Sequence, residues 1–145
     1  MKKPTLRNLK KKCWNLFSIY IRMRDGLLTT GSTEWALCIT CAKRYHFKML
    51  QAGHFVGGRH SGNLFSEKGT HAQCYNCNIN LKGNTLVYRR KIIELYGEGA
   101  DLELEAEAQN LLQYKPFQIE EIINIYEQKI KELKAKNKVI NENLL

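Results

Sequence analysis

Apolar residues recur at helical spacing near the start of the chain. Their spacing predicts an amphipathic helix within residues 1–28, with the lysines and arginines mostly on its other faces. The pair Asp25-Gly26 is a stop signal for this helix, and residues 29–32 are predicted to form a loop. The apolar face contains Leu6, Leu9, Cys13, Leu16, Phe17, Tyr20 and Ile21.

The second half of the chain is also helical in pattern. Residues 85–96 are predicted to form a helix that ends at Tyr96-Gly97, and the acidic stretch 98–107 is either a solvated helix or a linker. From residue 119 an apolar seam recurs at alternating steps of four and three. It either forms a two-stranded coiled coil, and so a homodimer through the C-terminal helix, or packs on its own domain. The seam contains Ile119, Ile123, Tyr126, Ile130, Leu133, polar Asn137, Ile140 and Leu144.

Between these helical regions lie two Cys-x-x-Cys pairs. The pairs are Cys38/Cys41 and Cys74/Cys77, and 32 residues separate Cys41 from Cys74. That gap is longer than in a simple zinc ribbon, so we expect an inserted hairpin that carries His54. Residues 56–70 are rich in Gly, Ser, His and Asn, which predicts a mobile surface loop.

The charge of the chain is unevenly distributed. The net charge is +9, and residues 1–60 carry 12 Lys and Arg against 2 Asp and Glu, whereas residues 98–145 carry 6 against 10. The positive region also holds the cysteines, as a polyanion-binding face requires. The alternative is that the lysine-rich faces only keep the protein soluble.

The cysteine pairs indicate a structural metal. No stretch approaches the length of a membrane span, and no secretory signal is recognisable, so we expect a cytoplasmic protein without membrane contact. Thiols stay reduced there, and two Cys-x-x-Cys turns supply the four sulfurs of a closed zinc site. Cys38, Cys41, Cys74 and Cys77 are the predicted ligands. Cys13 has no partner at such spacing and is predicted to be a small buried apolar residue.

His54 and Asn78 are the candidate catalytic residues. A nuclease of the HNH, or His-metal finger, type uses a histidine on a hairpin as general base and a divalent cation to stabilise charge on the phosphate. An oxygen ligand for that cation comes from the following helix, and Asn78 directly follows the last zinc cysteine. The pattern therefore predicts a catalytic Mg²⁺ or Mn²⁺ held by Asn78 beside His54.

Several runs of sequence resemble the phage lambda NinG family of recombination proteins, also called Rap. The runs are residues 12–22, Cys38-Ile39-Thr40-Cys41, Gln51-Ala52-Gly53-His54-Phe55, residues 71–78 and Lys82-Gly83-Asn84. The resemblance implies a phage-encoded protein, in the bacterial host cytoplasm, that cuts branched DNA of the Holliday-junction or D-loop type. The order of cysteines, histidine and asparagine is also similar to that of phage endonuclease VII, a junction resolvase.

Two positions depart from the general HNH pattern. The residue before the base histidine is commonly an aspartate that binds the cation, and here it is Gly53. A second position that is usually polar in the HNH pattern is Gly69 in this chain. Mg²⁺ often takes only one or two protein oxygens, so Asn78 with a neighbour is a sufficient set. The candidate supporting residues are His71, Asn80 and Asn84, each of which has a structural role as the alternative.

These patterns together predict an α+β protein. Its core is a small ββα-metal unit with a zinc knuckle pair of four cysteines, at residues 29–97, flanked by the N-terminal helix and by a helical region at 98–145. The predicted activity is structure-specific, cation-dependent cleavage of branched DNA, and the alternative is a non-catalytic protein that binds branched DNA. The predicted phosphate contacts are Arg59, Lys82, Arg89 and Arg90.

Overall fold

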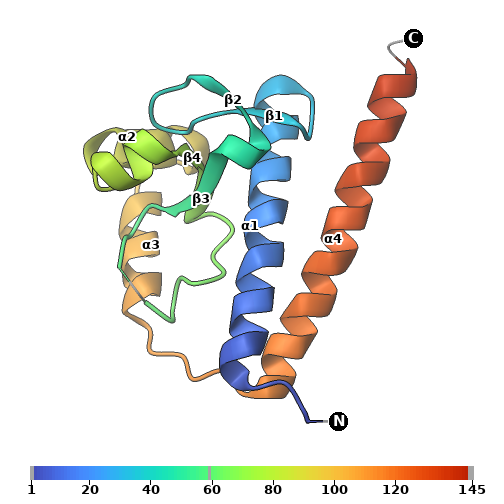
Figure 1. Cartoon of the computed structure of the whole chain (residues 1–145). Coiled ribbons are helices and arrows are strands. Elements are labelled where there is room, and N and C mark those ends of the chain that lie inside the picture. The colour runs from blue at the N-terminus through green and yellow to red at the C-terminus, as the bar shows by residue number, and fades with distance from the viewer. Residues whose placement is uncertain (1, 59, 144–145) are drawn as a thin grey trace.

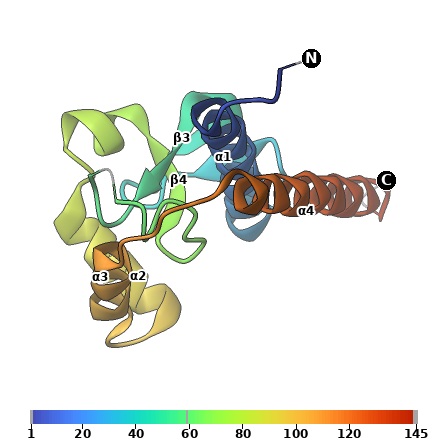
Figure 2. The same cartoon turned by 90° about the horizontal axis from the view of Figure 1, so that it is seen from below.

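The chain forms a mixed α+β structure in which one long helix lies between two layers. The computed structural model describes residues 2–58 and 60–143, the side chains of residues 139–143 excepted. Helix α1 (Leu6–Thr30) has α4 (Pro116–Asn143) along one side. The strands and the helices α2 (Thr85–Tyr96) and α3 (Ala100–Gln109) lie on its other side (Figures 1 and 2).

Helix α1 extends past the predicted stop signal, so that expectation was wrong. The helix ends only at Gly31, which has a φ of 79° and donates its N–H to the carbonyls of Gly26 and Leu27. Gly26 serves close packing instead, because a Cβ on it would lie 2.4 Å from the Ser32 oxygen. Of the residues predicted as a loop, Thr29 and Thr30 therefore belong to the last turn of α1, and Gly31 and Ser32 follow it.

The strands form two antiparallel hairpins. Strand β1 (Trp35–Leu37) pairs with β2 (Arg44–His46), and a 3₁₀ turn, η1 (Phe47–Met49), leads into the second hairpin. There β3 (Leu50–His54) pairs with β4 (Thr70–Cys74). The predicted hairpin carrying His54 is confirmed, with His54 at the end of β3 opposite Thr70.

The segment between β3 and β4 is packed against the rest of the molecule. Asn63 is buried and donates to the Val56 carbonyl, and the Phe65 ring packs edge-on against Phe17 of α1. Glu67 accepts a hydrogen bond from Tyr126 of α4. The stretch predicted as a mobile surface loop is thus held to both long helices by side-chain contacts.

The C-terminal seam packs within the chain. Helices α1 and α4 run side by side in the same direction (Figure 1), and the seam of α4 is buried against the apolar face of α1. Asn137 accepts the backbone N–H of Thr33. The side chain of Ile140 and all of Leu144 lie outside the described residues. A coiled coil through this seam would require α4 to leave α1. The buried seam residues are Ile119, Ile123, Tyr126, Ile130 and Leu133.

Helices α2 and α3 form the outer layer beside the second hairpin. The predicted helix at 85–96 is confirmed, and Gly97 ends it with a φ of 96°. The acidic stretch forms α3, which buries Leu104 against Tyr88 of α2 and Phe55. The Tyr88 hydroxyl donates to the Gly53 carbonyl at 2.7 Å. That bond fixes the end of β3, next to His54.

Candidate metal centre and His54 pocket

The four predicted zinc ligands lie together at the base of the second hairpin. All four Sγ atoms are within 4.8 Å of one another, and those of Cys41 and Cys74 are 3.8 Å apart. Sulfurs bound at about 2.3 Å around a tetrahedral zinc lie about 3.8 Å from each other. The four cysteines are therefore positioned to hold a metal ion, and their donor set fits a structural zinc.

Hydrogen bonds to sulfur prepare this cluster for a cation. The Cys74 N–H donates to Cys38 Sγ, and the Cys77 N–H donates to Cys74 Sγ. Burial acts to raise the pKa of Cys38, but bonds from the Thr40 hydroxyl and from backbone N–H groups outweigh it and lower the pKa to about 7. Burial and the neighbouring thiols raise the pKa of Cys41 to about 12. Thiolates so close together repel one another, so a cation must lie among them for all four to ionise.

His54 is held by two contacts at the end of β3. Its Nε2 lies 3.1 Å from the Leu64 carbonyl, and its ring stacks on Trp14 of α1 with centroids 5.2 Å apart. A carbonyl only accepts, so the Nε2 proton points to Leu64 and the lone pair of the neutral ring is on Nδ1. Burial lowers the pKa of His54, and this outweighs the opposing effect of the Leu64 and Asn63 carbonyls. The neutral, proton-accepting form is favoured at pH 7.

Asn78 lies on a π-helical turn, η2 (Asn76–Asn80), that starts between the last two cysteines. Its Nδ2 donates to Gln51 Oε1 at 2.7 Å. With the amide nitrogen engaged in this way, its oxygen is free to face the hairpin. A hypothetical Cβ on Gly53 would lie 3.1 Å from Asn78 Oδ1.

His54 and Asn78 line one pocket. The pocket has a volume of about 310 Å³, and Lys82 and the glycines 57, 58 and 83 also line it. A second pocket of about 340 Å³ lies on the other side of Asn78, along α1. It is lined by Trp14, Ser18, Arg22, Leu50, Gln51, Ala52 and Asn78. The structure therefore brings the two candidate catalytic residues to a single opening, flanked by a groove along the basic helix.

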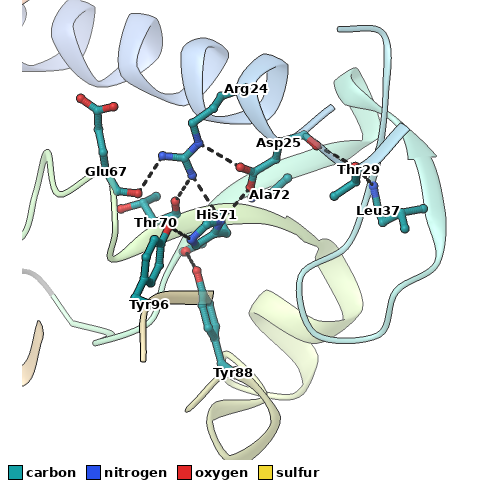
Figure 3. Close-up of polar contacts among 11 residues, drawn as sticks. Arg24, Asp25, Thr29, Leu37, Glu67, Thr70, His71, Ala72, Tyr88 and Tyr96 are labelled. Carbon is teal, nitrogen blue, oxygen red and sulfur yellow. Dashed lines mark hydrogen bonds and ion pairs between the residues drawn. The ribbon is translucent and has the colours of Figure 1, made fainter. Parts of the chain in front are cut away.

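His71 lies in a different, buried network (Figure 3). Its Nδ1 donates to Asp25 Oδ2 at 3.1 Å, and the Tyr96 hydroxyl lies 2.9 Å from its Nε2. Arg24 bonds the other oxygen of Asp25. Burial acts to raise the pKa of Asp25, but His71, Arg24 and the Ala72 N–H outweigh it and lower the pKa. This network joins α1 to β4, so His71 has the structural role.

The other two supporting candidates also point away from the pocket. The Asn80 amide donates to Asn76 Oδ1 on the exposed side of η2. Asn84 has a left-handed backbone at the start of α2, and its amide lies 3.8 Å from Cys77 Sγ. Neither residue lines the pocket with His54.

The four predicted phosphate contacts have different surroundings. Lys82 is exposed at the pocket and Arg90 is exposed on α2. Arg89 instead pairs with Asp101 and Glu105 of α3, so its charge is already neutralised. Arg59 lies outside the described residues.

Sequence reasoning missed three residues that shape the site. Trp14 stacks on His54, Gln51 orients Asn78, and Arg22 lines the neighbouring groove. All three lie inside the sequence runs that carry the family resemblance, but no spacing rule connects a residue in α1 to a hairpin histidine. That resemblance was the available signal for them.

Comparison with protein families gives a match. The family model described as Bacteriophage Lambda NinG protein matches residues 2–137. Comparison with curated proteins and with solved structures found no match. Over the described part of the chain, each helix is too short or too polar to cross a membrane.

Proposed function

This chain belongs to the bacteriophage lambda NinG family, and from that premise we propose that it is a cation-dependent endonuclease for branched DNA. Family membership implies a role related to phage recombination, in which branched DNA is the characteristic intermediate. One observation carries the proposal: a neutral histidine and an oriented amide oxygen line the same pocket of a zinc-knuckle hairpin, as in an HNH nuclease.

In the proposed reaction His54 is the general base. Its Nδ1 takes a proton from the attacking water while Nε2–H stays bonded to the Leu64 carbonyl, which stabilises the imidazolium as it forms. The stack on Trp14 prevents the ring from turning away. The lowered pKa of His54 keeps the base form populated at neutral pH.

Asn78 would hold the catalytic Mg²⁺ or Mn²⁺ through its oxygen. Such an ion, when bound, supplies charge stabilisation for the phosphate and the leaving oxygen. The residues fit it, because Gln51 occupies the amide nitrogen and leaves only the oxygen free. Zinc bound by the four cysteines would hold the start of η2 through Cys74 and Cys77, and would thus keep Asn78 at the pocket that His54 lines.

The charge distribution supports DNA as the substrate. Lys82 is exposed at the pocket, and Arg7 and Lys11 are exposed on α1, the helix that also borders the neighbouring groove. Positive charge along a groove releases counterions from the phosphate backbone when DNA binds. We expect affinity for DNA to fall steeply with rising salt.

A second candidate function is a protein that binds branched DNA without cutting it. Gly53 favours this alternative, because it supplies no carboxylate where HNH nucleases commonly carry one. The same basic surface would then hold a junction for a partner enzyme.

A cleavage assay separates the two functions. Protein with measured zinc content is incubated with four-way, flapped and linear DNA over a range of Mg²⁺ and Mn²⁺. If the protein is a nuclease, it should cut the branched DNAs only when cation is added, and a chelator should stop the cutting. Branched DNA that is bound but intact at every cation concentration supports the binding protein. Weak binding that does not respond to salt would contradict both.

A further inference from the structure

Because residue 53 is glycine, two amide oxygens lie close to its Cα. A Cβ built on Gly53 would lie 2.2 Å from Gln73 Oε1 and 3.1 Å from Asn78 Oδ1. One oxygen comes from β4 and the other from η2, so two separate elements direct oxygens at the place where a side chain of residue 53 would begin. Any residue larger than glycine would displace the Gln73 oxygen.

The orientation of Gln73 is fixed by its nitrogen. The side chain is fully buried, with 0% exposure. Its Nε2 donates to Thr40 Oγ1 at 3.1 Å and to the Gly83 carbonyl at 2.9 Å. Rotating the amide by half a turn would place its oxygen against the Gly83 carbonyl and lose that bond. The Thr40 hydroxyl in turn contacts Cys38 Sγ, so the zinc cluster supports this orientation.

The oxygen of Gln73 is left without a donor. Within the described part of the chain, Gln73 Oε1 is one of three buried side-chain atoms that have no hydrogen-bond partner. An unsatisfied buried acceptor costs about 1–3 kcal/mol, so its retention needs a reason. Asn78 has the same arrangement, with its nitrogen bonded to Gln51 and its oxygen turned to Gly53.

We propose that Gln73 Oε1 is a second ligand of the divalent cation and takes the place of the carboxylate that Gly53 lacks. The proposal rests on the proposed function, because it concerns the same cation site. Mg²⁺ and Mn²⁺ bind oxygen ligands, so two amide oxygens are a suitable set, with that of Asn78 at the open pocket and that of Gln73 buried. Mg²⁺ keeps several waters, and the open pocket at Asn78 admits them. Because both ligands are neutral, the site binds its cation weakly until DNA phosphates add negative charge.

Mn²⁺ binding in the absence of DNA tests this assignment. Zinc-loaded protein is titrated with Mn²⁺, and the free ion is followed by its electron paramagnetic resonance signal. Gln73→Met keeps the side-chain length but removes the oxygen, and we expect it to weaken binding about tenfold. Gln73→Glu adds a charge beside Asn78, and we expect it to tighten binding about tenfold. Asn80→Ala, which removes an exposed amide of η2 outside the pocket, is the matched control and leaves binding unchanged.

Equal Mn²⁺ affinity in folded, zinc-loaded wild type, Gln73→Met and Gln73→Glu would overturn the assignment. It would mean that Gln73 Oε1 only receives a weak contact from the Gly53 Cα–H. Anomalous diffraction from wild-type crystals grown with Mn²⁺ avoids the folding of any variant. The assignment requires a peak in contact with Gln73 Oε1 and Asn78 Oδ1, and a peak elsewhere, or none, refutes it.

The outcomes separate this inference from the proposed nuclease. If Mn²⁺ binding depends on Gln73 but wild type cuts no DNA, the cation site stands and the nuclease function fails. If wild type cuts branched DNA while Mn²⁺ binding does not depend on Gln73, the nuclease function stands and this ligand assignment fails.

Discussion

Replacing Asp25 by alanine is expected to destabilise the whole molecule. Asp25 is 4% exposed, and its carboxylate accepts bonds from Arg24 Nε at 2.9 Å, His71 Nδ1 at 3.1 Å and the Ala72 N–H at 2.7 Å. The Arg24 side chain is itself only 14% exposed. Alanine would leave this guanidinium without its carboxylate, and removing one partner of a buried ion pair costs about 3–5 kcal/mol.

This loss is large for a protein of this size. Domains are commonly stable by about 5–15 kcal/mol, so Asp25→Ala removes a major part of the free energy of unfolding. Asp25→Asn keeps the shape and one acceptor but loses the charge, and we expect it to cost about 1.5–3 kcal/mol. Urea denaturation of the zinc-loaded proteins at pH 7, followed by circular dichroism, measures both values.

The effect of Asp25 also depends on pH in a defined direction. The pKa of Asp25 is lowered in the folded state. Its contribution to the free energy of unfolding is therefore complete above the unfolded pKa of about 3.9, and it disappears as the pH falls through the folded pKa. The difference between wild type and Asp25→Asn should therefore shrink in acid. Glu127→Ala is the control, because the Glu127 side chain is 44% exposed and lies 3.7 Å from Lys12, and it should change stability by less than about 0.5 kcal/mol. An Asp25→Ala loss as small as the control value would refute the role given to this network.

Three further predictions concern the core, the metal and the base. Phe17→Ala removes a fully buried ring between Phe65 and Tyr126. It should lower the free energy of unfolding by about 3–5 kcal/mol and leave the zinc content unchanged. Wild-type stability of this variant would contradict the packing described. Cys74→Ser should lower zinc, measured by atomic absorption, below one ion per chain and reduce thermal stability, whereas retained zinc would exclude the four-sulfur site. Since the pKa of His54 is lowered, the pH at which DNA cleavage falls to half its maximal rate should lie below about 6.5, and a midpoint above that pH would refute a buried neutral base.

The metal cluster and the hairpin were predictable because they depend on local spacing. A Cys-x-x-Cys turn brings two sulfurs together wherever it occurs, and two such turns leave few arrangements for the residues between them. His54 consequently lies where expected, on a strand of the inserted hairpin. The apolar seam of α4 was also recognisable, but its spacing alone fits a partner in the same chain as well as one in another chain.

The errors came from residues whose role depends on distant parts of the chain. Asp25-Gly26 has the composition of a helix end. Asp25, however, accepts the backbone N–H of Ala72 in β4, and Gly26 packs closely against the backbone of Ser32 and Trp35. Arg89 looked available for DNA because its acidic partners on α3 are 12 and 16 positions away. The direction of the Gln73 amide is likewise set by Thr40 and Gly83, and no sequence pattern encodes it.

Cleavage of a four-way DNA junction by His54→Ala tests the central claim most directly. His46→Ala is the matched control, since His46 lies on β2 and its ring contacts Trp35 and Phe47, away from the pocket. Both variants should fold, bind zinc and bind the junction as wild type does. The account predicts that His54→Ala loses at least about a hundredfold in cleavage rate while His46→Ala retains it. Junction cleavage by His54→Ala at the wild-type rate would contradict it.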